Sequence, residues 1–280
     1  DESDDQITLT SNISAKEIHI FGYAGNDTVT VTGTMIATNA FTIDAGDGDD
    51  TVTVTGTGTI TAGSVSVDTG SGADTIQVDG TIMATKSATN TGVITFTTGT
   101  GEDVVTVTGS VTAEDFIVST GDDDDIVTFD IDVEGGRLLT GHVQVLGGAG
   151  DDLVTVNRLH SRADTMDING QGGKDDVIIN IRGDATSYLI NVTDTGAAND
   201  GADTLTINGT DANDVFLLRE KFVAYLTRNP EYNIDDEDST NDNQFLMPVE
   251  RINYDSSING RLTVTGGLGD DQFYADDNSA

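Results

Sequence analysis

The chain has no cysteine and no tryptophan, and only 2 prolines and 12 basic residues among 280. Without cysteine, no disulfide can hold the fold together, which makes a bound metal ion a more plausible staple. Scarce proline suits β-strands, because proline removes a hydrogen bond from a β-ladder. No apolar run approaches the roughly 20 residues of a membrane-spanning helix. We therefore expect no direct insertion into a membrane.

The shortage of basic residues leaves a strongly acidic protein. Its 49 acidic residues give a formal net charge of −37, and 40 of them are Asp. Such a charge excludes ordinary binding to nucleic acids. Asp is a poor helix former but suits tight turns and metal ligation. Two carboxylates about 4 Å apart repel by roughly 4 kcal/mol at an effective dielectric of about 20. We therefore expect bound cations, with halophile-like acidity spread over the surface as the alternative.

One phrase, Gly-x-Gly-x-Asp-x-apolar-x-apolar, recurs along the chain, for example as AGDGDDTVTV at 45–54 and GGAGDDLVTV at 147–156. Up to Asp203, its anchoring aspartates are 22 to 29 residues apart, about 25 on average. A degenerate extra copy follows at 208–218. Self-similarity at such a period is typical of repeat architectures. The anchoring residues are Asp27, Asp50, Asp74, Asp103, Asp125, Asp152, Asp175, Asp203 and Asp271.

Alternating apolar runs flank each copy, such as 41–43 and 65–67. Period-2 alternation predicts strands with one apolar face. Stacked coils would share one continuous core that no single coil could bury. The sequence therefore predicts an all-β fold, a right-handed parallel β-helix or β-roll-like solenoid of about 24-residue coils. We expect Val, Ile and Phe to point inward, and Thr, Ser and Asp to point outward.

The Gly/Asp turns have the chemistry of a calcium site. Calcium takes six to eight oxygen ligands from carboxylates and backbone carbonyls. Glycine permits positive φ, so that carbonyls can turn toward an ion, and each Asp adds a carboxylate. Stacking brings equivalent turns together, so calcium would convert their repulsion into cross-links. The alternative is that these residues only turn the chain.

The turns resemble those of the RTX (repeats-in-toxin) family. GGAGDDLVT at 147–155 and GGLGDDQFY at 266–274 match that family's Gly-Gly-x-Gly-x-Asp-x-apolar-x pattern. Nonapeptides of the family usually run in tandem, whereas this chain has one per coil, which implies a larger coil with calcium along one edge. Other copies replace a glycine by Thr69, Thr98, Thr120, Tyr23, Gln171 or Asp123.

The resemblance implies several bound Ca²⁺ ions and an extracellular or cell-surface location. It implies that the anchoring aspartates ligate calcium together with carbonyls of the glycine turn. Asp214, in the degenerate copy, is a weaker candidate. Adjacent carboxylates that could also serve are Asp49, Asp123, Asp151, Asp176 and Asp270.

The chain divides into repeats at 1–218, an irregular segment at 219–262 and a final repeat at 263–280. The irregular segment holds both prolines, several aromatic residues and the acidic run 235–238. It is interpreted as a cap or loop over the rod. The alternative is a binding loop that makes the chain an adhesin module for a surface glycan or protein.

These features favour a structural protein of a surface layer, filament or adhesin, and not an enzyme. Parallel β-helices include polysaccharide-modifying enzymes, which is the less favoured interpretation. The three histidines are scattered, and neither H-E-x-x-H nor G-x-S-x-G is present. Interrupted repeats at both ends suggest end-to-end self-association or neighbouring repeats in a longer chain.

Overall fold

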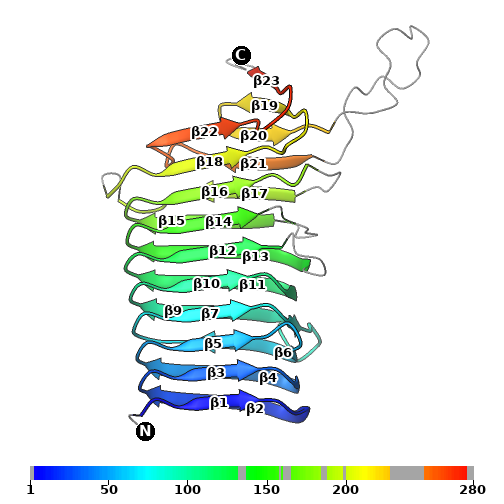
Figure 1. The fold of residues 1–280 in the computed structure, drawn as a ribbon, viewed down its shortest axis with the longest axis vertical. Helices are drawn as coiled ribbons and strands as arrows, with labels where there is room; N and C mark the ends of the chain where they lie inside the picture. Colours follow the sequence, from blue (N-terminus) through cyan, green and yellow to red (C-terminus); the bar gives the residue numbers. More distant parts are fainter. Residues whose placement is uncertain are drawn as a thin grey trace, which may run out of the picture.

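The predicted fold is confirmed. A computed structural model describes residues 3–131, 137–157, 159, 165–183, 188–197, 200–227 and 249–275. The described residues form strands and no helix, in a parallel β-solenoid of about 24-residue coils (Figure 1). The coils stack into a rod with the N-terminal coil at one end and the C-terminal strands at the other. Consequently, the described part of the chain has no helix long and apolar enough to cross a membrane.

One side of the rod is a 10-stranded parallel sheet made of short strands, one from each coil. Each of these strands begins directly after a Gly/Asp turn or its equivalent. In spatial order they are β1 (Gln6–Leu9), β3 (Thr28–Val31), β5 (Thr51–Val54), β7 (Thr75–Val78), β10 (Val104–Val107), β12 (Ile126–Asp130), β14 (Leu153–Asn157), β16 (Asp176–Asn180), β18 (Thr204–Asn208) and β22 (Arg261–Thr265).

The other side is a 13-stranded sheet of mostly longer strands that lead into the turns. Its main path is β2 (Ile13–Ala24), β4 (Thr34–Asp47), β6 (Thr59–Asp68), β8 (Thr81–Ala84), β11 (Ser110–Asp122), β13 (Arg137–Ala149), β15 (Thr165–Gly172), β17 (Tyr188–Thr193), β21 (Glu250–Tyr254), β20 (Phe222–Tyr225), β19 (Val215–Arg219) and β23 (Gln272–Ala275). Strand β9 (Val93–Thr100) lies off this path and pairs with β6 and β11.

The core is a set of columns, because parallel pairing in register places equivalent side chains above one another. Val29 pairs with Val52, and Val52 pairs with Ile76. Phe96, Phe116 and Phe129 pack edge to face with ring centroids 5.1 and 6.1 Å apart, a favourable aromatic geometry. Apolar side chains at these inward positions are buried along the rod. This continuous core holds the turns of successive coils in line.

The regular stack changes near the C-terminal end. β19 and β20 form an antiparallel hairpin, and β20 pairs antiparallel with β21. The predicted irregular segment 219–262 thus contributes β20 and β21 to the large sheet. The Arg251 guanidinium lies 4.0 Å from the Phe222 ring centre. The acidic run 235–238 and both prolines lie outside the described residues, and the proposed division into three parts stays a prediction.

Candidate metal-binding edge

The six residues of each Gly/Asp turn, numbered here 1 to 6 as in Gly147–Asp152, have a repeated backbone conformation. Positions 2 and 4 have positive φ in the turns from 22–27 to 170–175 and in 266–271, as at Gly148 (φ 123°) and Gly150 (φ 138°). Carbonyl oxygens of one turn point at these glycines in the next. A Cβ added to Gly148 would lie 1.8 Å from the Gly121 carbonyl oxygen. Glycine is therefore required here by conformation and by close backbone approach.

Three non-glycine residues occupy these positions: Tyr23 (φ 82°), Asp123 (φ 82°) and Gln171 (φ 84°). They are three of the residues that depart from the glycine pattern in the sequence. Their conformation costs roughly 1 to 2 kcal/mol relative to glycine.

Replacing Gln171 by Gly is therefore expected to stabilise the fold by about 0.5–1 kcal/mol, since glycine returns part of the gain as unfolded-state entropy. Urea denaturation in calcium measures the change. Gly148→Ala, at the same position one turn earlier, should be destabilising because of the close carbonyl. A Gln171→Gly variant that is less stable than wild type would contradict the strain assignment.

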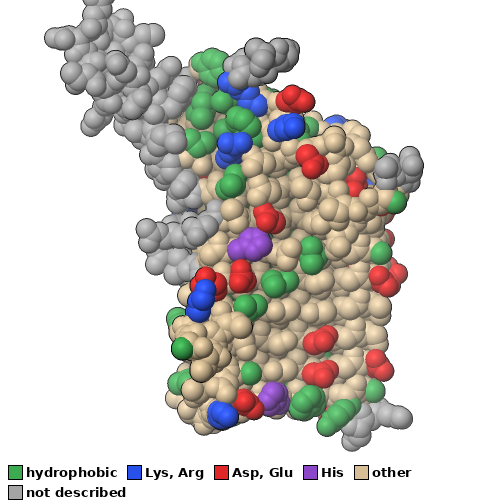
Figure 2. All heavy atoms as spheres, turned by 180° about the vertical axis from the view of Figure 1, so that it is seen from behind, with side chains coloured by type: hydrophobic (Ala, Val, Ile, Leu, Met, Phe, Trp, Pro, Cys, Tyr) green, Lys and Arg blue, Asp and Glu red, His purple; other side chains and the backbone are tan. Residues whose placement is uncertain are grey.

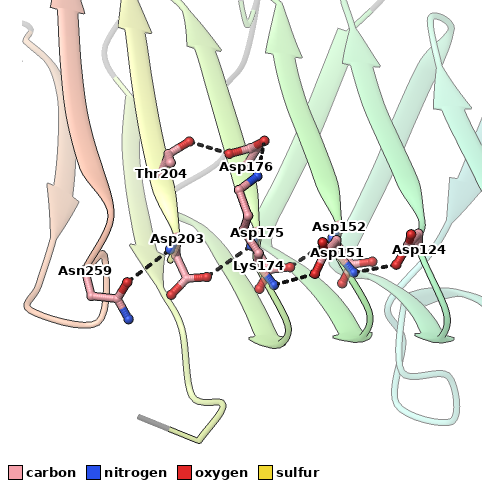
Figure 3. A network of polar contacts seen from close by, with 9 residues as sticks. All are labelled: Asp124, Asp151, Asp152, Lys174, Asp175, Asp176, Asp203, Thr204 and Asn259. Carbon is pink, nitrogen blue, oxygen red and sulfur yellow. Dashed lines mark hydrogen bonds and ion pairs between the residues drawn. The ribbon is translucent and has the colours of Figure 1, made fainter. Parts of the chain in front are cut away.

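At position 6, the anchoring aspartates form a column inside the rod. The side chain of each one accepts a hydrogen bond at Oδ1 from the backbone N–H of the aspartate one coil earlier. The Asp50 N–H donates to Asp74 Oδ1 at 2.8 Å, and the Asp125 N–H donates to Asp152 Oδ1 at 3.0 Å. Figure 3 shows part of this line. The buried aspartate column comprises Asp27, Asp50, Asp74, Asp103, Asp125, Asp152, Asp175 and Asp203, each 1–3% exposed.

The second oxygen, Oδ2, is buried and accepts no hydrogen bond in all eight members of the column. In turns with glycine at position 1, Oδ2 lies against that glycine. A Cβ added to Gly147 would lie 2.2 Å from Asp152 Oδ2. The expectation that Asp points outward is therefore wrong for this column. Period-2 alternation puts Asp27 on the same side of the chain as Val29 and Val31, and this parity was a usable signal in the sequence.

Burial perturbs these carboxyl groups. Burial raises the pKa of Asp125 and of Asp152 from 3.8 to about 7, and the bonds from the preceding N–H groups oppose this rise. It raises the pKa of Asp74 as well. Neighbouring carboxylates add to the increase, because a second negative charge disfavours ionisation. The pKa rises to about 6 in Asp50, Asp103 and Asp175.

A second, solvent-exposed line of side chains follows position 5 along the same edge. Asp151 Oδ1 accepts from the Lys174 N–H at 2.8 Å, and the Asp151 N–H donates to Asp124 Oδ1 at 2.7 Å (Figure 3). Asp49 Oδ1 likewise accepts from the Ala73 N–H at 3.0 Å. These bonds run opposite to those of the buried column. The candidates Asp49 and Asp151 therefore lie on the edge but outside the column.

The remaining candidates are more dispersed. Asp123, at position 4, is exposed. Asp176 is on the outer face of the 10-stranded sheet, where its Oδ1 accepts from the Thr204 hydroxyl at 2.5 Å. That bond lowers the pKa of Asp176.

A separate pair forms where the last turn meets the degenerate copy. The Asp214 N–H donates to Asp271 Oδ1 at 3.0 Å, and exposed Asp270 stands beside them. Asp214 is fully buried, with its carboxylate bonded to the Thr210 backbone N–H and hydroxyl and to the Tyr225 hydroxyl. Its oxygens are thus already engaged within the hairpin region.

Sequence reasoning missed the residue that ends the column. Asn259 Oδ1 accepts from the Asp203 N–H at 3.2 Å (Figure 3). Asn259-Gly260 precedes the alternating run of β22, which was the available signal. The role of three buried threonines beside the column, Thr69, Thr98 and Thr120 at position 1, was also missed. The Thr120 hydroxyl donates to the Gly147 carbonyl at 2.7 Å and so ties two coils together.

Among the described residues, no three Asp, Glu, His or Cys side chains converge tightly enough to form a metal site by themselves. A cation at this edge would need backbone carbonyl oxygens in addition to column carboxylates. In turns with glycine at position 1, such a carbonyl lies near Oδ2: a Cβ added to Gly147 would lie 2.7 Å from the Gly170 carbonyl oxygen. Carboxylate and carbonyl oxygens are ligands for a hard cation such as calcium. Comparisons with known protein families, with curated proteins and with solved structures found no match.

Proposed function

We propose that this chain is a calcium-stabilised structural segment of an extracellular or cell-surface protein, with calcium between neighbouring Gly/Asp turns. One observation carries the proposal: eight buried carboxylates stand in line, each with an Oδ2 atom that has no hydrogen-bond partner. A buried carboxylate without a counter-charge is unfavourable by several kcal/mol. Calcium supplies that charge and accepts carboxylate and carbonyl oxygens together.

The spacing of the column supports an ion shared between coils. Neighbouring strands are about 4.8 Å apart, so two ionised column members repel by roughly 3 kcal/mol at an effective dielectric of about 20. An ion between two turns is attracted to both carboxylates and cross-links the coils. Protons are the competing way to neutralise the column, but pKa values of about 6 at Asp103 and about 7 at Asp125 and Asp152 leave these carboxyls partly ionised at neutral pH.

A fold that depends on bound calcium favours a location where calcium is abundant. Calcium that binds only the folded state stabilises it by mass action. Where calcium is scarce, a chain with a net charge of −37 keeps its self-repulsion. The folded rod, whose coils share one core and one cross-linked edge, suits a role as an extended spacer on a cell surface.

Removal of calcium at neutral pH is therefore expected to convert the compact β-rod into an expanded, largely unfolded chain. Far-UV circular dichroism and hydrodynamic radius would be compared in EGTA, then with millimolar calcium, millimolar magnesium or high NaCl. Compaction with calcium alone supports the proposal. A fold unchanged by EGTA, or restored equally by NaCl, would instead favour an acidic solenoid that needs only screening.

A further inference from the structure

The outer face of the 10-stranded sheet carries a regular array of threonines. Because the strands pair in register, their outward side chains form ranks along the rod. Two ranks run through all ten coils, and a third, on β12 to β22, consists of Asp130, Asn157, Asn180, Asn208 and Thr265. The second rank is threonine in eight of its ten coils and contains no charged residue. It comprises Thr8, Thr30, Thr53, Gln77, Thr106, Thr128, Thr155, Ile178, Thr206 and Thr263.

The first rank contains only one carboxylate, Asp176, and one cation, Arg261. Its members are Gln6, Thr28, Thr51, Thr75, Val104, Ile126, Leu153, Asp176, Thr204 and Arg261. The opposite face of the rod is different, because acidic, basic and histidine side chains are scattered over the 13-stranded sheet (Figure 2). Glu17, Asp44 and Asp68 are exposed there. The outer face of the 10-stranded sheet is thus unusually low in charge for this protein.

An apolar band crosses the middle of this face. Val104, Ile126 and Leu153 are first-rank neighbours on β10, β12 and β14, the fifth, sixth and seventh strands of the ten. Ile126 is 42% exposed. Apolar side chains at outward positions of adjacent strands leave a hydrophobic patch in contact with water. Such a patch gains free energy when another surface covers it.

We propose that this face binds a second copy of the chain, so that two rods associate face to face. Two molecules of net charge −37 repel each other, and the two ranks that run through all ten coils of this face hold a single carboxylate, Asp176. Ten strands about 4.8 Å apart and two ranks of side chains cover about 50 by 13 Å. The contact would bury roughly 1,200 Å² in total, at the lower limit of specific interfaces.

The face is self-complementary about a two-fold axis parallel to the strands, between β10 and β12. That axis brings the Val104 of one copy against Ile126 of the other, so that the apolar band meets itself. It sets Asp176 opposite Thr51, and Arg261 opposite Gln6, so no carboxylate of these ranks faces another. The acidic turn edges of both copies then lie on the same side. We therefore expect the dimer to strengthen as ionic strength screens their repulsion.

The test measures mass against concentration in millimolar calcium by sedimentation equilibrium. The wild-type chain, 29.2 kDa, should reach twice that mass at high concentration and physiological salt. Ile126→Asp should stay monomeric, with dimerisation weakened at least about tenfold, because it places like charges in the centre of the contact. Ile36→Asp is the matched control, since Ile36 is 44% exposed on the opposite sheet.

Circular dichroism of each variant shows whether the rod is intact. If Ile126→Asp does not fold, Thr128→Asp, on the same strand in the second rank, replaces it. A wild-type chain that is monomeric throughout would overturn the proposal. So would a dimer that Ile126→Asp and Thr128→Asp leave unchanged, or one that Ile36→Asp disrupts equally. None of these results depends on whether calcium is required for folding.

Discussion

In calcium-free buffer, the chain is expected to gain several kcal/mol of stability as pH falls from about 8 to about 5. Many proteins behave in the opposite way, because salt-bridged carboxylates lose their partners on acidification. In this rod the buried aspartate column reverses the direction of the pH dependence of stability. Burial raises the pKa of five members from 3.8 to between about 6 and about 7.

The direction of this pH dependence follows from the number of protons that the folded and unfolded states bind. An unfolded Asp has a pKa near 3.9, so between about pH 4 and 7 the folded state binds more protons than the unfolded state. The free energy of unfolding then rises as pH falls, by about 1.4 kcal/mol per pH unit for each extra proton bound. The gain is complete below about pH 4, where both states are protonated, and absent above about pH 8. Neighbouring members interact, so their contributions do not add simply.

Far-UV circular dichroism in metal-free buffer follows folding as the pH is lowered from about 8 to about 5, and urea denaturation measures stability at each pH where the chain is folded. The double variant Asp125→Asn/Asp152→Asn should show a flatter pH profile, because these two carboxyls have the largest pKa increases in the column. The double variant removes only two of the 49 acidic residues and so leaves general charge repulsion almost intact. A flatter pH profile therefore assigns the effect to the column. A wild-type midpoint that is constant, or that falls on acidification from about pH 8 to 5, would contradict the assignment.

The repeat and the sheet topology could be predicted from the sequence because two signals agree in phase. The Gly-x-Gly-x-Asp phrase sets where each coil turns, and the alternation after it sets which residues face inward. Thr28–Val31 and Thr51–Val54 follow Asp27 and Asp50 at the same distance, so their register is fixed. The alternation predicts only a short run at 41–43, yet β4 is one strand from Thr34 to Asp47 with an irregularity between Ala37 and Ala40. A bulge allows a strand to bend at a corner without ending.

The environment of the candidate site was harder to predict. Composition indicated that acidic turns need neutralising charge. It did not indicate that one carboxylate oxygen of each column member accepts a hydrogen bond and that the other has no partner. That asymmetry depends on the backbone at positions 2 and 4, which places the N–H of one coil beside Oδ1 of the next. Only the parity of Asp27 with Val29 pointed to burial, and the usual preference of Asp for solvent outweighed it.

The antiparallel pairing of β19, β20 and β21 was not predicted, for a different reason. β19 and β20 contain runs such as Val215-Phe216-Leu217-Leu218 that do not alternate, so periodicity alone does not identify them as strands. Their pairing is antiparallel, and β21 follows β20 only after the long segment 226–249. Asn259 takes its place in the column 56 residues after Asp203. An interval of that length gives no indication of which residue resumes the stack.

Asp125→Asn is expected to have opposite effects with and without calcium. Near pH 8 in EGTA, the variant should be about 2–4 kcal/mol more stable than wild type, because a carboxyl with a pKa raised to about 7 is replaced by a neutral amide. The amide oxygen can still accept the Asp103 N–H. Asn259 already occupies the equivalent place at the end of the column and accepts the Asp203 N–H, so an amide is compatible with this geometry.

With calcium the variant should be less stable than wild type, because it lacks a charged oxygen that wild type offers to the ion. We expect a calcium midpoint of folding at least about tenfold higher than in wild type, and lower stability at saturating calcium.

Asp124→Asn is the matched control: the neighbouring side chain is exposed, carries the same charge and accepts a hydrogen bond from the Asp151 N–H. Its removal should change stability by less than about 0.5 kcal/mol in either condition. Far-UV circular dichroism of the three proteins in EGTA, where wild type is expected to be largely unfolded, and urea denaturation in calcium separate the possibilities. If Asp125→Asn is stabilising in both conditions, the column is neutralised by protons alone and calcium does not bind at Asp125. If it is destabilising in both, the ionised carboxylate has a partner within the fold, and the orphaned Oδ2 would not be the reason for calcium dependence.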